Sequence, residues 1–404
     1  MKTSVLIFLA LLVFTISTAA ADSDPQTPWH IEERCISHIA LAPKAWSYPG
    51  TLLMSGYAGI HAMQADWETP HVVAFFHADH LGYPIEGGQL SPDAMWYAVP
   101  VGERFTEVSF NVYWFARGLR IYSSIDDTEL SFNLSDYYEL LNRVPGIPET
   151  AWTYEAVGWI DNESLVMGQL LFRPFEDEVE VAGFSVGEST FTDLAIAPDW
   201  TRAFGYIRSG AGYEGIFDPA AEDIVIAPLQ AEAVAWRPDS SGFIAEQVSE
   251  AEDQLSLFSR DGEFIERLYI ADKWCLDISR PVAGRNELGW SPTNRYFAFV
   301  HDLAYPKSTE LVLLDMTDRI AINTCLNSVA QPVWSPDGTQ VALLVPASED
   351  LHVVILDMES WTAYVVARQS GLSGVLKPDM LAWRPAAIEE KIHPLASSHS
   401  NGDE

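Results

Sequence analysis

The chain has 404 residues, of which 48% are hydrophobic and 12% aromatic, and its 23 basic and 57 acidic residues give a formal net charge of −34. This charge argues against nucleic acid and anionic membranes as partners, because both repel a strongly negative protein. The apolar content is enough for a large core and excludes extensive disorder outside the two ends.

The first 21 residues are predicted to be a secretory signal peptide. Lys2 precedes a mostly apolar run from Val5 to Ile16, and Ala19–Ala21 forms a small-residue cleavage site before Asp22. The run is shorter than the roughly 20 residues needed to span a membrane. We therefore expect cleavage before Asp22, a secreted, periplasmic or extracellular location, and no integral membrane segment afterwards. Residues 22–49 are expected to be an N-terminal extension.

A loose motif recurs seven times along the rest of the chain. Its clearest copy is PVWSPDGTQVALLVP, from Pro332 to Pro346, in which one apolar strand ends at a Ser-Pro-Asp-Gly turn and a second strand follows. Repeats at such intervals are typical of solenoids, propellers or arrays. The aligned positions are Leu90, Trp159, Ile196, Trp236, Trp290, Trp334 and Trp383.

One period of the motif contains four short strands. After the strand that ends at Trp334, strand-forming runs cover Gln340–Leu344, His352–Leu356 and Thr362–Val366, with polar residues between them. Four antiparallel strands per period of about 45 residues form one blade of a β-propeller. The sequence therefore predicts an all-β propeller.

The phrase from Trp334 to Gly338, followed by an apolar strand, resembles the propeller repeat of the TolB family, a distant relative of WD repeats. The resemblance covers roughly Gly50 to Ala386, nearly the whole mature chain. It implies the propeller fold and says little about function. The N-terminal extension is too short for the α/β domain that precedes the propeller in TolB, so a role in the Tol system is not carried over.

The two ends of the repeat region are expected to complete one blade together. The stretch from Met380 to Ala386 supplies only a first strand, whereas the stretch from Gly50 to Phe76 supplies three strands without a first. Pairing these ends removes two exposed sheet edges. We predict one seven-bladed domain over residues 50–386, followed by a polar, disordered tail over residues 387–404.

Two irregular intervals leave six or eight blades as alternatives. The copy at Trp159 matches the motif poorly, and the propeller would have six blades if this copy were not a true repeat. The interval from Leu90 to Trp159 is the longest, and it would allow eight if it contained another blade. The segment Ser135–Gly146 within this interval is a candidate helical insertion.

Propeller geometry assigns the motif to one face. The first strand of each blade is innermost and ends at the Ser-Pro-Asp-Gly turn, so these turns share a face with the turns between third and fourth strands. We expect structural roles for the turn residues Asp93, Asp199, Asp239 and Asp337. We also expect packing between blades for the repeat residues Trp159, Trp236, Trp290, Trp334 and Trp383.

The longer loops lie on the opposite face and are the candidate binding surface, because function is usually carried by loops on a rigid scaffold. Three loop segments combine aromatic and charged residues, which suits the binding of protein, peptide or glycan. The candidate binding residues are Trp152, Tyr154, Trp274, Arg280, His301 and Tyr305.

Three cysteines are present. Cys275 and Cys325 both fall in predicted blade-to-blade connections on the same face, so a disulfide between them is expected in an oxidising compartment. Cys35 precedes the first strand and is either free or paired elsewhere.

Two patterns suggest chemistry but lack the context for it. Gly183–Gly187 matches G-x-S-x-G, yet an esterase elbow needs a helix after the serine, and here another repeat follows. The spacing of His77 and His80 is compatible with two metal ligands. The sequence shows no further ligands at a matching spacing, and a metal site needs three or four. We therefore predict no catalytic residues, no metal and no cofactor.

These observations predict an exported, non-catalytic propeller that binds a protein, a peptide or an envelope component such as a glycan through its loop face. The alternative is a propeller enzyme of the glycan lyase or hydrolase type with a site in the central funnel. Fold alone does not decide between them, because propellers serve both purposes.

Overall fold

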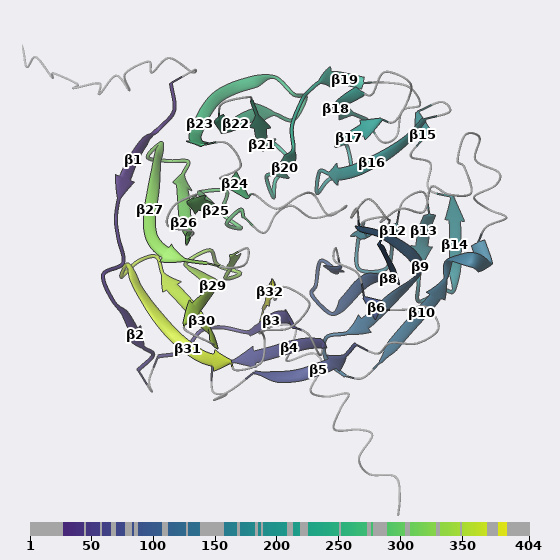
Figure 1. The fold of residues 1–404 in the computed structure, drawn as a ribbon, viewed down its shortest axis with the longest axis horizontal. Helices are drawn as coiled ribbons and strands as arrows, with labels where there is room; N and C mark the ends of the chain where they lie inside the picture. Colours follow the sequence, from purple (N-terminus) through teal and green to yellow (C-terminus); the bar gives the residue numbers. More distant parts are fainter. Residues whose placement is uncertain are drawn as a thin grey trace, which may run out of the picture.

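The structure is a computed structural model, and it describes residues 27–43, 46–56, 59–65, 70–76, 83–84, 88–106, 112–126, 128–137, 157–167, 170–181, 185–186, 189–207, 213–218, 225–249, 252–272, 276–277, 289–303, 308–328, 332–347, 350–369 and 379–385. Seven sheets stand in a ring, as Figure 1 shows, which confirms the predicted seven-bladed β-propeller.

The first four blades follow the chain from its closing strand. Blade I consists of β32 (Asp379–Arg384), β3 (Thr51–Gly56), β4 (Gly59–Gln64) and β5 (His71–Phe75). Blade II consists of β6 (Tyr83–Pro84), β7 (Gln89–Leu90), β8 (Trp96–Thr106), β9 (Val112–Ser123) and β10 (Glu129–Asn133). Blade III consists of β11 (Val157–Trp159), β12 (Leu165–Met167), β13 (Leu170–Arg173) and β14 (Glu178–Val181). Blade IV consists of β15 (Ser185–Val186), β16 (Ser189–Ile196), β17 (Ala203–Ile207), β18 (Tyr213–Phe217) and β19 (Val225–Pro228).

The remaining three blades complete the ring. Blade V consists of β20 (Ala233–Trp236), β21 (Gly242–Val248), β22 (Glu252–Ser259) and β23 (Phe264–Asp272). Blade VI contains β24 (Leu276–Asp277), β25 (Tyr296–Leu303), β26 (Ser308–Asp315) and β27 (Ile320–Asn327). Blade VII contains β28 (Val333–Trp334), β29 (Gln340–Ala347), β30 (Asp350–Asp357) and β31 (Thr362–Gln369).

The ring closes as predicted, by pairing the two ends of the repeat region. Strand β32 runs antiparallel to β3, with Trp383 opposite Leu52 and Arg384 opposite Thr51. The last strand of the domain thus becomes the inner strand of blade I, and the edge of β3 that would otherwise be open is paired.

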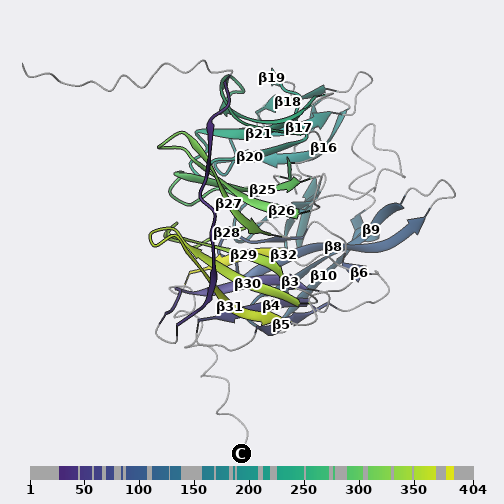
Figure 2. The same ribbon diagram turned by 60° about the vertical axis from the view of Figure 1, so that its left-hand side comes forward.

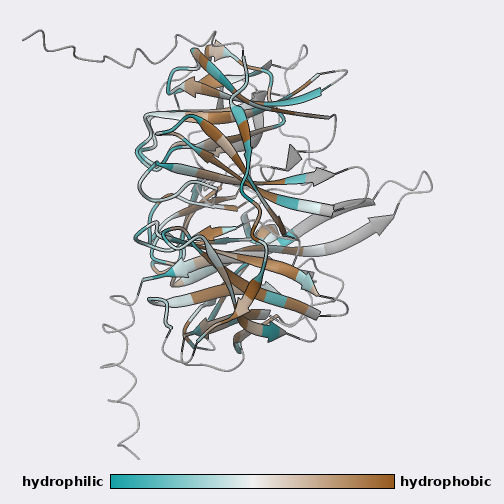
Figure 3. Cartoon of the chain, turned by 90° about the vertical axis from the view of Figure 1, so that its left-hand side faces the viewer, coloured by the Kyte–Doolittle hydropathy of each residue, from teal (hydrophilic) through white to brown (hydrophobic). Residues whose placement is uncertain are grey.

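Each blade buries both of its faces, because it is packed between two neighbours. In β29, Val341 and Leu343 pack in a cluster with residues of blade VI, whereas Ala342 and Leu344 pack with residues of blade I. A strand buried on both faces is a continuous apolar run rather than an alternating pattern. Figure 3 shows this distribution, with hydrophobic residues along the strands and hydrophilic residues in the turns at the edge of the propeller.

The repeat tryptophans join neighbouring blades by hydrogen bonds as well as by packing. In four copies of the motif the indole Nε1 donates to a backbone carbonyl of the preceding blade. The accepting residue comes directly before the residue of that blade that aligns with the tryptophan. The pairs are Trp159 with Gln89, Trp236 with Ala195, Trp290 with Ala235 and Trp334 with Gly289, at 2.9 to 3.0 Å. Trp383 differs, since its Nε1 donates to the carbonyl of Pro49.

The blade without a motif tryptophan uses a replacement. Blade IV has Ile196 at the aligned position, and the neighbouring turn residue Trp200 donates its Nε1 to the carbonyl of Ile160 in blade III at 3.2 Å. The blade-to-blade bond is therefore kept although the residue that makes it has moved by four positions.

The long interval between Leu90 and Trp159 contains a long hairpin instead of an eighth blade. Strands β8 and β9 have 11 and 12 residues and pair along their whole length. Of the predicted helical insertion at Ser135–Gly146, only residues 135–137 are described, and they belong to the 3-10 helix η1 (Leu134–Tyr137).

The N-terminal extension forms a strap along the outer edge of the ring, which the sequence did not predict. This strap, residues 29–43, contains β1 (His30–Glu33) and β2 (Ile39–Leu41). Strand β1 pairs in parallel with β27 of blade VI, and β2 pairs in parallel with β31 of blade VII. Figures 1 and 2 show the strap running across the outer strands of both blades, which become five-stranded sheets.

The predicted disulfide between Cys275 and Cys325 is wrong in its pairing. Cys325 is bonded to Cys35 of the strap, with 4.9 Å between the two Cα atoms. Cys325 lies in the outer strand β27 and not in a blade-to-blade connection, so it meets the strap that covers this strand. Cys275 lies outside the described residues.

Candidate functional site: the loop face of blades II and VI

The turn face is built from hydrogen bonds within each motif. Asp337 Oδ1 accepts from Ser335 Oγ at 2.6 Å and from the backbone N–H of Thr339 at 3.0 Å, and Ser335 Oγ accepts from the N–H of Gln340. Ser91 and Asp93 repeat this arrangement in blade II. The carboxylate of Asp337 is thus used to shape the turn, which agrees with a structural role.

The fourth residue of this turn has a left-handed backbone in five blades. The φ angles lie between 57° and 72° at Ala94, Trp200, Ser240, Asn294 and Gly338. Only one of these positions is glycine, which accepts this conformation without steric cost. The turn geometry is therefore imposed by its hydrogen bonds more than by the residue at that position.

The opposite face carries the ends of the second strands and the loops between blades. Of the six predicted binding residues, His301 lies within the described part of the chain, near the end of β25. The other five lie outside it: Trp152, Tyr154, Trp274, Arg280 and Tyr305.

His301 contacts the neighbouring blade through Tyr269. The Tyr269 hydroxyl lies 3.0 Å from His301 Nδ1, and the two rings meet edge to face with centroids 5.7 Å apart. Tyr269 belongs to the outer strand β23 of blade V and is buried. Burial, helped by the negative charge of Glu310, raises the pKa of Tyr269 to about 12. The phenol therefore stays protonated at neutral pH and can donate to a neutral imidazole.

Glu310 extends this contact toward the outer strand of blade VI. It lies directly opposite His301 in the β25–β26 ladder, and its Oε2 accepts from Asn323 Nδ2 at 2.7 Å. Tyr269, His301, Glu310 and Asn323 form what we term the polar row, which crosses from blade V to the outer strand of blade VI. Sequence reasoning found only His301 of these four, because the others come from strands that carry no motif.

The β8–β9 hairpin extends from the loop face of blade II. Inner strands β6 and β7 pair with β8 only as far as Gly102, and β10 pairs with β9 only from Gly118 onward. In the described residues, Glu103–Thr106 pair with Val112–Phe115 and with no third strand. Figure 2 shows this two-stranded ribbon standing clear of the propeller body.

The ribbon is also a feature that sequence reasoning missed. Its two strands and the segment between them read ERFTEVSFNVYWF, from Glu103 to Phe115, which is rich in aromatic residues. The ladder sets Phe105 opposite Tyr113 and Arg104 opposite Trp114. The unusual length of the interval between Leu90 and Trp159 was the signal that pointed here.

The two patterns suggestive of chemistry remain without support in the described residues. Ser185 of the G-x-S-x-G sequence lies in β15, which turns back as an antiparallel hairpin with β16 instead of entering a helix. His77 and His80 lie outside the described ranges. Within those ranges no group of three or more His, Cys, Asp or Glu side chains is arranged to hold a metal ion.

Comparisons with known proteins yield likeness in fold only. No family model matches the sequence, and no curated protein sequence matches it. The structure is similar to TolB from Acinetobacter baumannii, with 12% identity and a TM-score of 0.41 over 82% of this chain and 67% of that one. It is also similar to a putative TolB from Agrobacterium tumefaciens, with 14% identity and a TM-score of 0.38 over 58% and 88%.

An enzyme is among the similar structures as well. An oligogalacturonate lyase in complex with manganese has 12% identity and a TM-score of 0.43, over 84% of this chain and 89% of that one. These likenesses are too distant to assign a function to this chain.

None of the helices in the described residues is long and apolar enough to cross a membrane.

Proposed function

We propose that this protein is an exported, non-catalytic binding scaffold, and that its loop face holds a protein or peptide partner. The observation that carries the proposal is the β8–β9 ribbon, which extends beyond every other strand of its blade. The export part rests on the N-terminal sequence, in which Lys2, an apolar run and Ala19–Ala21 have the order of a signal peptide.

The ribbon has properties that favour a partner. At about 3.4 Å per residue, the four paired positions from Glu103 to Thr106 extend it by about 14 Å beyond its last third-strand contact. An isolated two-stranded hairpin is marginally stable in water. Its sequence is nevertheless rich in aromatic residues, the type most often found at the centre of protein interfaces. A partner that covers the ribbon would supply the packing that a third strand gives elsewhere.

The polar row and the charge of the chain set the chemistry of such a partner. Tyr269, His301 and Glu310 place donors and acceptors on the loop-face side of blades V and VI. The net charge of −34 favours a partner with basic residues. Rim charges of this kind act mainly on the association rate, so the rate should fall with added salt.

The proposal is tested by shortening the ribbon. In the variant, residues 103–115 are replaced by Asn-Gly, so that a tight turn joins Gly102 and Ala116, which already face each other in the ladder. The mature protein and this variant are used to capture partners from the native secreted or envelope fraction. Far-ultraviolet circular dichroism and the thermal midpoint show whether the propeller itself is intact.

We expect a partner that the full-length protein retains and the folded variant loses. Equal capture by both proteins would contradict a role for the ribbon. Turnover of a glycan or an ester by the mature protein, with no macromolecule captured, would overturn the proposal in favour of an enzyme.

A further inference from the structure

The strap is held to the propeller from one side only. Strands β1 and β2 add to the outer edges of β27 and β31 as fifth strands, and most of their residues are exposed. Ile31 is 45% exposed and Leu41 is 67% exposed, which are high values for large apolar side chains. Segments with few buried apolar contacts open locally at low cost in free energy.

The first residue of the strap is its buried anchor. Trp29 is 7% exposed and packs between blades V and VI in the same cluster as Leu268. Its backbone N–H donates to the carbonyl of Leu268 at 3.1 Å, and its Nε1 donates to Glu266 at 2.9 Å. Beyond this anchor the strap is held by the two parallel ladders, by the disulfide, by further hydrogen bonds, and by Ile36 and Ile39, which pack against the core between blades VI and VII.

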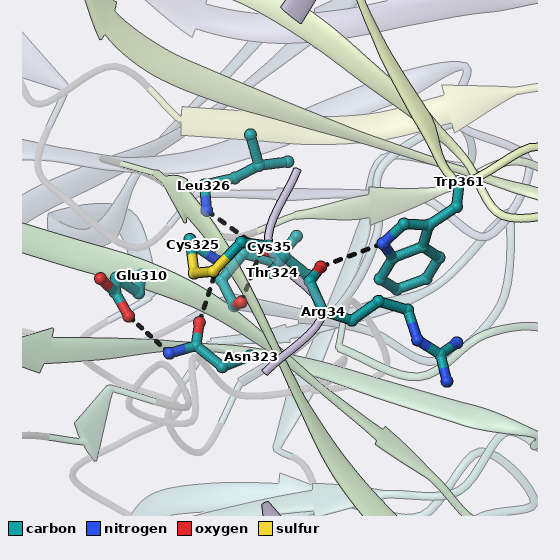
Figure 4. The surroundings of a disulfide bond; sticks show 9 residues. Arg34, Cys35, Glu310, Asn323, Thr324, Cys325, Leu326 and Trp361 are labelled. Carbon is teal, nitrogen blue, oxygen red and sulfur yellow. Dashed lines mark hydrogen bonds between the residues drawn. A yellow bond between two sulfur atoms is a disulfide. The ribbon is translucent and has the colours of Figure 1, made fainter. Parts of the chain in front are cut away.

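The disulfide joins the strap to blade VI between these two ladders. Cys35 lies two residues after the end of β1, and the backbone N–H groups of Arg34 and Ile36 on either side of it donate to the carbonyls of Asn323 and Thr324 of β27. Figure 4 shows the bond beside Arg34, Asn323 and Thr324. It also shows Trp361 of blade VII, whose Nε1 donates to the carbonyl of Arg34. Cys35 is exposed and Cys325 is half-buried. An exposed disulfide can be approached by an attacking thiolate.

The geometry points to a redox latch: we propose that the Cys35–Cys325 disulfide holds the strap closed, and that reduction by a dithiol lets residues 30–41 detach from β27 and β31. A thiolate of the reductant attacks one sulfur and releases the other cysteine as a thiolate. The second thiol of the reductant then resolves the mixed disulfide. Two protein thiols and one oxidised reductant result, with two electrons transferred to the protein.

Release of the strap changes the surface of the propeller. The outer edges of β27 and β31 lose their parallel partner strands, so their N–H and C=O groups become available to another extended strand. The anchor at Trp29 and the entry of the chain into β3 both remain in place, so the strap opens as a loop fixed at its two ends. This inference concerns the strap and the outer edges, and it stands independently of the loop-face function.

Amide hydrogen exchange of the mature protein tests the latch directly. The exchange of the oxidised protein is compared with that of protein treated with dithiothreitol and then alkylated, with mass spectrometry to count the new thiols. We expect exchange at residues 30–41, and at the strap-facing amides of β27 and β31, to rise by about tenfold or more on reduction. Strands β12 and β13 of blade III, which contact no part of the strap, should not change.

Three variants separate the latch from the anchor. Cys35→Ser should show the fast exchange of the reduced protein without any reductant, whereas Cys275→Ser should behave as the oxidised protein does. Trp29→Ala should leave residues 34–36 protected in the oxidised form and lose that protection on reduction. If amide exchange in the strap is as slow in the reduced protein as in the oxidised protein, the latch does not exist. A disulfide that dithiothreitol leaves intact in the folded protein overturns the proposal equally.

Discussion

Trp334 donates a hydrogen bond from its indole Nε1 to the backbone carbonyl of Gly289, 3.0 Å away in the preceding blade. The same carbonyl also accepts from the N–H of Ala298 within its own blade. One oxygen thus ties the ladder of blade VI to the inner strand of blade VII. Three further tryptophans repeat this relationship around the ring.

Replacement of Trp334 by Phe should lower the free energy of unfolding by roughly 2 kcal/mol. The variant loses one neutral hydrogen bond and some ring volume in a buried position, but the carbonyl of Gly289 keeps its bond from Ala298. Urea unfolding followed by fluorescence measures the change. Trp361→Phe is the matched control, because that indole makes an exposed bond and should cost less than about 1 kcal/mol. Equal losses in the two variants would contradict a special role for the blade-to-blade bond.

Replacement of Gly338 by Ala should destabilise the protein by about 1 kcal/mol. The residue has a φ of +72°, and an added Cβ would lie 3.3 Å from Thr293 Cγ2 of the neighbouring turn. Gly338→Asn should cost less, since asparagine tolerates the left-handed region better than alanine does, and Asn294 occupies the equivalent position next door. Thermal unfolding midpoints of the three proteins should fall in the order Gly, Asn, Ala. An alanine variant as stable as the parent would show that the turn does not hold this conformation.

Asp315 should contribute stability that disappears in acid. Burial opposes its ionisation, but the hydrogen bonds from Arg295 and from the N–H groups of Asp318 and Thr317 prevail and hold its pKa below the usual value. A carboxyl with a depressed folded pKa stabilises above its unfolded pKa of about 3.9, and this contribution is lost as the pH falls through the folded value.

The Asp315→Asn variant measures that contribution. It should be less stable than the parent at pH 7, and its thermal midpoint should fall less between about pH 5 and pH 2.5. Asp318→Asn is a suitable control, because Asp318 is more exposed and only its longer contact of 3.8 Å to Arg295 is changed. Parallel curves for the parent and Asp315→Asn would contradict the assignment.

Tyr269 should ionise at a higher pH than an ordinary tyrosine, and its contribution to stability should be lost when it ionises. Its pKa is raised to about 12 by burial and by Glu310. A group with a raised folded pKa contributes stability that is complete below its unfolded pKa of about 10 and is lost as the pH rises through the folded value. The stability should therefore fall between about pH 10 and pH 12.

Ultraviolet titration of the tyrosinates checks this. In the Tyr269→Phe variant, one tyrosine that titrates at high pH should be missing. The variant should also be less stable to unfolding by about 1 kcal/mol at neutral pH, because it loses the hydrogen bond to His301. Tyr296→Phe is a less buried comparison, whose pKa burial also raises. A titration curve unchanged by Tyr269→Phe at its alkaline end would contradict the proposed shift.

The sequence by itself determined the ring. Its blades are built from local repeats, and the residues around Trp334 contain a strand, a turn and a second strand within a few positions, so their pattern is readable without any knowledge of distant contacts. The pairing of the strand at Trp383 with the strand at Leu52 could also be predicted from the sequence, because the incomplete repeats at the two ends can be completed only by each other.

Only the tertiary structure decided the strap, the disulfide and the polar row. Cys35 and Cys325 are 290 residues apart, and the choice between Cys35 and Cys275 as partner depended on a parallel pairing of β1 with β27 that no repeat encodes. Tyr269 and His301 likewise meet because two blades pack side by side. Such contacts follow from the closed ring, which sets distant outer strands and the N-terminal chain next to one another, and a local sequence pattern carries no record of them.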